Sequence, residues 1–173
     1  MRYFIMKQDQ HLSYSFKLRD FDMNGKHQVF HKEEANQLND TSFLYVVGKG
    51  DEAYSDFIQN PVYMASEVVQ GVLDMYEDEL ISKKVVIIHK ETQREEIYYH
   101  IITDHIEALS EKALFYPDGL EKKIILDREK IGDHHVFQLK DVKGVYLIVS
   151  LAVVESLLRR QVQGILFEEV EVV

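Results

Sequence analysis

Two short segments hold the residues best suited to metal chemistry, because imidazole and carboxylate groups are typical zinc ligands. These residues are His100, Asp104 and His105 in YYHIITDHIE, and Asp133, His134 and His135 in DHH. The chain has neither an HExxH motif nor a helical histidine pair at ligand spacing. In a strand, His134 and His135 would point to opposite faces, so at most one could join a given site. We therefore favour structural or solvated histidines, and keep a small hydrolase or metal-dependent enzyme that uses His100, Asp104 and His105 as an alternative.

Two serines each follow an apolar run and precede a helical pattern, which is the position of the nucleophile in some hydrolases. That nucleophile elbow needs glycine two residues before and two residues after the serine. Around Ser66 and Ser150 these four positions hold Met64, Val68, Ile148 and Ala152. We therefore interpret both serines as helix N-caps, each worth about 1 kcal/mol of stability. The segment GKGDE likewise lacks the spacing of a phosphate-binding loop.

Composition narrows the class of protein further. The 173 residues include 30 acidic and 20 basic side chains, for a formal net charge of −10, and no cysteine. The lack of cysteine excludes disulfides, thiolate zinc sites and cysteine nucleophiles. An acidic surface repels nucleic acid and anionic membranes and attracts a cationic partner. We expect a single domain, residues 1–173, that binds neither nucleic acid nor membrane.

The location of the protein also follows from the apolar pattern. The opening residues MRYFIMKQDQ become polar too soon for a signal peptide. No apolar run approaches the ~20 residues needed to cross a bilayer. We expect a cytoplasmic protein that is a monomer or a weak homo-oligomer.

Segments rich in β-branched and aromatic residues predict the strands. They are RYFIM, SFLYVV, the two apolar runs of KKVVIIHKETQREEIYYHII, ALFY, KKIILD, HHVFQL and VYLIVS. The two central runs predict a hairpin. The segment YPDGL predicts a turn between ALFY and KKIILD, because proline presets φ and glycine accepts positive φ. The Asn-Gly pair in DMNGK is a further turn signal.

Two helices are expected after Ser66 and Ser150, each with apolar residues at positions i, i+1, i+4 and i+5. The apolar residues are Val68, Val69, Val72 and Leu73 in the first, and Val153, Val154, Leu157 and Leu158 in the second. This spacing predicts that each set of four lies on one helical face. Each helix leads to a strand, VVIIH or GILFEEV, so the chain holds two similar strand–Ser–helix–strand modules. The distance from serine to doublets differs by one residue, which favours independent use of common building rules over duplication. Many strands with two principal short helices predict an α+β fold with a mostly antiparallel or mixed sheet.

The two helices differ in the charge at their C-terminal ends. The second ends in Arg159 and Arg160, which suit the negative end of the helix dipole, and Gly164 suits the exit from the helix. The first ends in the acids Asp74, Glu77, Asp78 and Glu79. Acids there are unfavourable, and places where a local rule fails are candidate functional sites. The plainer interpretation is a solvated loop, or pairing with the following Lys83 and Lys84.

A family resemblance rests on both modules. The stretches YSDFIQNPVYMASEVVQGVLDMY and IVSLAVVESLLRRQVQGILFEEV, with EEIYYHIITDHIEAL and REKIGDHHVFQLK between them, resemble a family of bacterial immunity proteins. It is the immunity family numbered eleven among polymorphic toxin systems, formerly a domain of unknown function. The matching residues are Asp56, Phe57, Ser66 and Glu67 in the first part, and Ser150, Leu151, Val153, Glu155, Leu157, Leu158, Arg159, Gly164, Phe167 and Val170 in the second. The resemblance covers residues 54–173, with 1–53 as the N-terminal part of the same domain.

The resemblance implies a cytoplasmic protein that neutralises a cognate toxin by binding it, with no catalysis and no cofactor. The net charge fits a cationic toxin domain such as a nuclease. Asp74, Glu77, Asp78 and Glu79 are the residues we expect to contact that partner. Two alternatives stay open, the metal-dependent enzyme named above and a self-associating structural protein.

Overall fold

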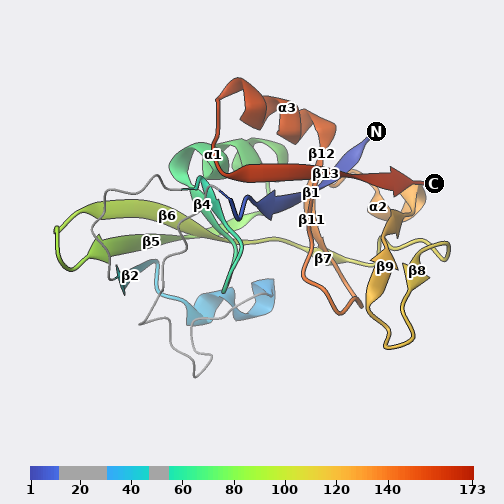
Figure 1. Ribbon diagram of the computed structural model, residues 1–173, viewed down its shortest axis with the longest axis horizontal. Helices are drawn as coiled ribbons and strands as arrows, with labels where there is room; N and C mark the ends of the chain where they lie inside the picture. The colour runs from blue at the N-terminus through green and yellow to red at the C-terminus, as the bar shows by residue number, and fades with distance from the viewer. Residues whose placement is uncertain (12–30, 47–54) are drawn as a thin grey trace.

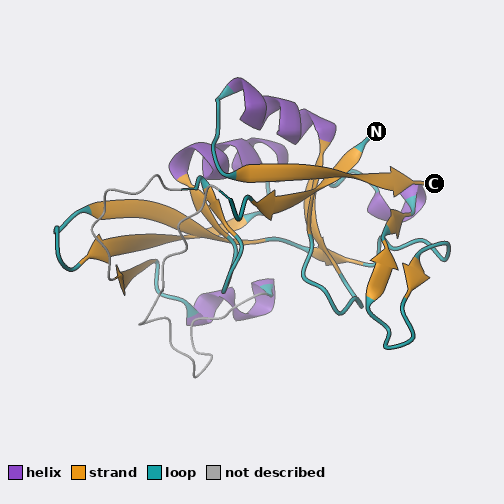
Figure 2. Cartoon of the chain, viewed as in Figure 1, coloured by secondary structure: helices purple, strands orange, loops and turns teal. Residues whose placement is uncertain are grey.

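The computed structural model describes residues 1–11, 31–46 and 55–173. In chain order its elements are β1 (Tyr3–Gln8), η1 (Lys32–Gln37), β2 (Thr41–Val46), β3 (Phe57–Ile58), β4 (Met64–Ser66), α1 (Glu67–Tyr76), β5 (Ile81–His89), β6 (Glu95–Ile102), β7 (His105–Ile106), β8 (Leu114–Phe115), β9 (Glu121–Lys123), β10 (Ile125–Leu126), α2 (Arg128–Ile131), β11 (Val136–Leu139), β12 (Leu147–Ser150), α3 (Leu151–Arg159) and β13 (Ile165–Val172). Figures 1 and 2 show short helices combined with mixed sheets, so the predicted α+β class is confirmed. The predicted turn at DMNGK lies outside the described residues.

Two sheets form the framework. The five-stranded sheet has the order β2-β5-β6-β4-β3, and the six-stranded sheet has the order β10-β13-β1-β12-β11-β7. The predicted hairpin of β5 and β6 is present, and β8 pairs with β9 across YPDGL, where Gly119 has φ +81°. The N-terminal strand β1 lies inside the six-stranded sheet between β12 and β13, so residues before 54 help to build the same sheet as residues after it. None of the described helices is long and apolar enough to span a membrane.

The two predicted modules prove to be parts of two larger units with one topology. The first unit contains β3, β4, α1 and β5 with β6 and β2, and the second contains β11, β12, α3 and β13 with β1 and β10. In each, the helix joins two strands that both pair antiparallel with one strand between them, β6 or β1. The strand before the helix pairs antiparallel with an outer strand, which is β3 beside β4 or β11 beside β12. The strand after the helix pairs parallel with another outer strand, which is β2 beside β5 or β10 beside β13.

The units also share individual hydrogen bonds. The backbone N–H of Ser66 donates to the carbonyl of Asp56 at 2.8 Å, and that of Ser150 donates to the carbonyl of His135 at 2.9 Å. Opposite each serine in the register lies a tyrosine, Tyr98 in β6 and Tyr3 in β1. The Tyr98 hydroxyl donates to the Ser55 carbonyl at 2.7 Å. The Tyr3 hydroxyl donates to the His134 carbonyl at 3.0 Å. Each hydroxyl thus holds the residue two positions before the first strand of its own unit.

The buried positions of the helices correct the prediction of four residues on one face. Val68 is 47% exposed and Leu158 is 58% exposed, so that prediction was wrong at these two residues. Four residues at that spacing cover about 140° of a helix, so the outermost one reaches solvent. The buried positions shared by the two helices are Val69, Val72 and Leu73 in α1, and Val153, Ser156 and Leu157 in α3. They lie three, six and seven residues after the serine in both helices. The one-residue difference in the distance from the serine to the apolar doublets therefore does not apply to the buried positions.

One apolar core joins the two units. The helices α1 and α3 pack against each other on the same side of the sheets (Figure 1). Their buried residues share a cluster with Ala65 of β4, Phe4 and Met6 of β1, and Val149 of β12. Separate clusters cover the opposite faces of the six-stranded and the five-stranded sheets. Both helices therefore bury their apolar faces in a core to which both sheets contribute.

Each unit also touches the first strand of the other through the chain that leaves its helix. After α3, Gly164 has φ +72° and its carbonyl accepts from the Ser55 hydroxyl at 2.9 Å. Gln163 and Asp56 are joined by two hydrogen bonds: Asp56 N–H donates to the Gln163 carbonyl at 2.9 Å, and the Asp56 carboxylate accepts from Gln163 N–H at 2.7 Å. Gly164 has the positive φ that we expected, but the residue that leaves α3 in the left-handed region is Gln161, at φ +55°, directly after the C-cap Arg160. A Cβ at 164 would lie 2.9 Å from the Cα of Ser55, so this junction also needs the small residue.

Candidate partner-binding site

The end of α1 presents acids of very different exposure. Asp74, Asp78 and Glu79 are exposed, and the Glu79 side chain retains 81% of its accessible surface. The Glu77 side chain retains only 12%. The four acids predicted to contact a partner therefore separate into three that face solvent and one that is mostly buried.

Glu77 is buried because it makes the reciprocal contact between the two units. Its Oε2 accepts from the backbone N–H of His135 at 3.3 Å and from that of Val136 at 3.4 Å, at the start of β11. Its Oε1 lies 3.5 Å from Nδ1 of His134. These donors compensate for the unfavourable place of an acid at a helix C-terminus. The sequence showed the conflict with the helix dipole but not the distant N–H groups that resolve it.

The second unit adds to the same surface. Met75, Tyr76, Glu77, Asp78, Glu79, Asp133 and His134 line an open depression of about 640 Å³. Asp133 is exposed and lies in the turn before β11, far along the chain from α1. Its signal in the sequence was the acidic start of DHH, which pointed to metal chemistry and not to this surface. We call Asp74, Glu77, Asp78, Glu79 and Asp133 the acidic surface.

Lys32 does little to neutralise the acidic surface. The Lys32 ammonium lies 2.5 Å from Oδ2 of Asp104 and 3.6 Å from Oε2 of Glu79. The Lys32 side chain is only 18% exposed, so its charge is directed inward to Asp104. The expected pairing of the acids with the lysines that follow does not occur at Lys83, whose ammonium lies 2.6 Å from Asp40.

The structure does not bring the three residues of the enzyme hypothesis into one metal-ligating group. His100 is a buried residue of β6 at 4% exposure. His105 packs against His31, with ring centroids 4.4 Å apart. Burial lowers the pKa of His105, and the charge of His31 lowers it further. Asp104 faces Lys32. In the described part of the chain, the group that could hold a metal combines Asp104 with Glu77 and His134 instead.

The adjacent histidines of DHH do diverge, as the sequence analysis expected. His134 faces Glu77, whereas Nδ1 of His135 lies 2.8 Å from the hydroxyl of Ser150. The two serines therefore differ as well. Ser66 caps α1 by accepting from the N–H of Val69 at 3.4 Å, which confirms the prediction. Ser150 has the N-cap position of α3, but its fully buried hydroxyl bonds His135 and makes no capping bond, so the capping role predicted for it was wrong.

The arginines at the end of α3 act as predicted. Nη1 of Arg160 donates to the Ser156 carbonyl at 3.0 Å and to the Ser156 hydroxyl at 2.7 Å. Arg159 lies 3.8 Å from Glu155 on the same helix. Both positive charges stand at the negative end of the helix dipole, where they are favourable. They leave α3 with a basic end where α1 has an acidic one.

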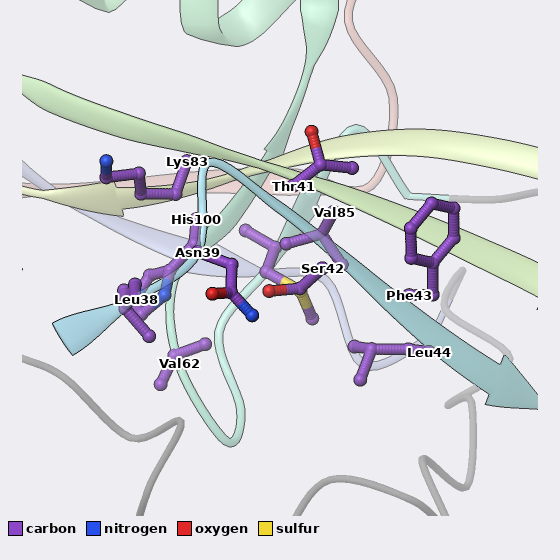
Figure 3. A pocket seen from close by; sticks show the side chains of 11 residues that line it. Leu38, Asn39, Thr41, Ser42, Phe43, Leu44, Val62, Lys83, Val85 and His100 are labelled. Carbon is purple, nitrogen blue, oxygen red and sulfur yellow. The ribbon is translucent and has the colours of Figure 1, made fainter.

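A second cavity, of about 270 Å³, lies on the five-stranded sheet (Figure 3) and shares no lining residue with the depression at the acidic surface. The described residues that line it are Leu38, Asn39, Thr41, Ser42, Phe43, Leu44, Val62, Met64, Lys83, Val85 and His100. The lining is largely apolar, and the Lys83 ammonium is bound to Asp40. No acid lies beside a base among these residues. They therefore support neither the metal chemistry nor the nucleophilic catalysis that the sequence analysis considered.

The fold defines an α+β class of protein, and the acidic surface lies on its exterior. A sequence model of the Imm11 immunity protein family matches residues 84–172, just over half of the chain. The chain belongs to the Imm11 immunity protein family, in agreement with the resemblance found in the sequence. The match spans β6, the DHH segment and the whole of the β11–β12–α3–β13 module. No curated protein matches the chain.

Proposed function

We propose that this chain is a non-enzymatic immunity protein of the cytoplasm, which binds a cognate toxin domain and blocks its activity. Membership of an immunity protein family supports the role. We further propose that the partner is a cationic, nuclease-like toxin domain and that the acidic surface contacts it. The net charge of −10 supports both steps, because complementary charge steers association and fixes orientation.

One observation carries the choice of surface. Exposed carboxylates from the segment that follows α1 and from the turn before β11 line an open depression together with Met75, which is 57% exposed. An apolar side chain within a charged rim is the usual composition of a protein interface. Glu77 lies at the base of this surface and contributes charge, whereas Asp74, Asp78 and Glu79 are exposed for direct contact. The proposed complex needs one copy of the chain, so we expect a monomer or a weak homo-oligomer before binding.

The first experiment tests the role itself. Toxin domains encoded beside the gene of this chain are purified, and their activity is measured with increasing amounts of the chain. We expect inhibition that is complete at one chain per toxin domain. Full inhibition by far less than one chain per toxin domain would indicate catalysis and contradict the proposed function. Absence of inhibition with every neighbouring toxin would contradict it as well.

The second experiment tests the surface. The variant Asp78→Lys/Glu79→Lys should lower the association rate constant by about tenfold at low salt and flatten its salt dependence, because it removes steering. The matched control is Glu91→Lys/Glu95→Lys, which changes the net charge equally at exposed positions near the tip of the β5–β6 hairpin. Equal slowing by both pairs would show an effect of net charge alone and would reject the acidic surface as the contact.

A further inference from the structure

Three potential metal ligands converge beside the acidic surface from three distant segments. Glu77 follows α1, Asp104 lies between β6 and β7, and His134 precedes β11. One ligand atom from each side chain lies within 4.8 Å of the other two. All three side chains are partly buried, at 12%, 28% and 34% exposure respectively. The set therefore differs from a group of solvated surface acids.

The Glu77 carboxylate is compensated at one of its two oxygens by backbone N–H groups. Within the described part of the chain, no lysine or arginine lies within ion-pair distance of its carboxylate, and its one ion-pair partner is His134. A mostly buried carboxylate is costly unless a cation or several donors compensate for it. The backbone N–H groups of His135 and Val136 occupy Oε2, which leaves Oε1 directed at His134. Oε1 is therefore the Glu77 oxygen placed to share a cation with the imidazole.

Asp104 is held in a similar way. Its Oδ2 bonds the Lys32 ammonium at 2.5 Å, so its other oxygen can still ligate. Each carboxylate thus has one oxygen fixed by a protein donor and one oxygen left to bind, which is how metal-ligating carboxylates are oriented by their surroundings. The same ammonium also lies near Glu79, so a single lysine serves two acids and does not reach Glu77.

His134 supplies the nitrogen ligand on a fixed backbone. Its carbonyl accepts from the Tyr3 hydroxyl, which in turn accepts from Nη1 of Arg128 at 3.1 Å. Its ring packs edge-on against Phe137, with centroids 6.4 Å apart. The imidazole is therefore restricted on one side by the core and has Nδ1 directed at Glu77.

We propose that Glu77, Asp104 and His134 bind one divalent transition-metal ion of the Zn²⁺ type. One imidazole nitrogen and two carboxylate oxygens suit Zn²⁺, which accepts three protein ligands and a water, whereas Mg²⁺ and Ca²⁺ prefer oxygen alone. The three ligand atoms lie within 4.8 Å of one another, and metal–ligand distances of about 2.0–2.2 Å require them to move closer together when an ion binds. The ion ties the end of α1 to the turn before β11, and so ties one unit to the other. This inference shares only Glu77 with the acidic surface, and the exposed acids proposed for direct contact, Asp74, Asp78 and Glu79, take no part in it.

The test uses the purified full chain after treatment with a chelator. Titration calorimetry with Zn²⁺ should give one site per chain, Mg²⁺ should give none, and Co²⁺ should give visible absorption bands of a low-symmetry site. The variants Glu77→Gln and His134→Ala should each weaken Zn²⁺ binding by about 100-fold or more. Glutamine keeps an oxygen acceptor for the two backbone N–H groups, so Glu77→Gln should retain the fold, which circular dichroism checks.

Two matched controls make the site specific. His135→Ala removes the neighbouring imidazole, and Glu79→Gln removes a neighbouring acid, and both should bind Zn²⁺ as the wild type does. Zn²⁺ should also raise the melting temperature of the wild type and of the controls but not of His134→Ala. Absence of stoichiometric binding, or equal binding by His134→Ala, would overturn the metal site. Toxin inhibition measured in the presence of chelator reports on the proposed function separately.

Discussion

The two units of this protein share a framework and differ at the ends of their helices. Both place a tyrosine opposite the serine, and both hold the start of their first strand with its hydroxyl. The first helix ends in acids, whereas the second ends in Arg159 and Arg160. The shared features are those that this topology needs in order to form. The differing features mark what is particular to each unit, and the acidic surface is the largest of them.

The junctions between the units also combine a shared position with different local detail. The chain that leaves α3 reaches the segment before β3 through Gln163 and Gly164, which bond the Asp56 carboxylate and the Ser55 hydroxyl. The chain that leaves α1 reaches β11 through the Glu77 carboxylate. Both junctions therefore use a carboxylate of the first unit, Asp56 or Glu77, that accepts from backbone N–H groups of the second unit. They differ in their surroundings, because Glu77 lies in a mostly buried place beside Asp104 and His134.

The largest expected effect tests whether equivalent buried leucines contribute equally to the stability of the two units. Leu73 and Leu157 are both 0% exposed and lie seven residues after their serines. Each change to alanine should cost about 2–5 kcal/mol of unfolding free energy, through lost burial and a cavity. Urea denaturation measures both.

Leu158→Ala is the matched control, because Leu158 is 58% exposed. Its cost should stay within about 0.5 kcal/mol. A loss at Leu158 as large as that at Leu157 would show that the buried positions were assigned wrongly.

The glycine junction gives the next largest effect. Gly164→Ala should lower the free energy of unfolding by about 2 kcal/mol, because φ is +72° and the new Cβ would lie 2.7 Å from the Cβ of Ser55. Gly71→Ala is the control inside α1, where a Cβ meets no atom within 4 Å. That change should stabilise by about 0.5–1 kcal/mol through helix propensity. In thermal unfolding, Gly164→Ala should therefore lower the melting temperature and Gly71→Ala should raise it.

The repeated tyrosine bond tests whether the two units are equivalent in energy. Tyr98→Phe and Tyr3→Phe should each cost about 1–2 kcal/mol, because each leaves a carbonyl without its donor. Tyr3→Phe should cost at least as much, since it also removes the acceptor of Arg128. Denaturant titration of the two variants compares them directly. If one variant lost almost no unfolding free energy, the two tyrosine hydrogen bonds would be equivalent in geometry but not in energy.

The smallest expected effect separates the two serines. Ser66→Ala should cost about 0.5–1 kcal/mol, and Ser66→Asp should restore the loss because aspartate is also a good N-cap. At Ser150, which is fully buried and bonded to His135, aspartate should not restore the stability lost in Ser150→Ala. Recovery by aspartate at both positions would show that Ser150 caps α3 after all.

Much of the framework was predictable because its signals are local. The β5–β6 hairpin, the turn at YPDGL, the strands on either side of the helices and the cap at Ser66 follow from β-branched runs, Pro-Asp-Gly and a serine before a helical pattern. The exposure of Val68 and Leu158 was not predictable, since periodicity gives a face but not the width that neighbours cover. The partner of Ser150 was also beyond reach, because His135 approaches it across a pair of strands.

The sequence by itself determined the α+β class, the two modules, the contrast between acidic and basic helix ends, and the family. These depend on residue type and on spacing within about twenty positions. The tertiary structure alone decided that the modules belong to two units of equal topology and that Glu77 is buried while Asp78 and Glu79 are exposed. It also decided that Asp104 and His134 meet Glu77 rather than His100 and His105. The reason is physical, because these facts depend on which distant backbone and side-chain groups pack together, and no local pattern encodes that.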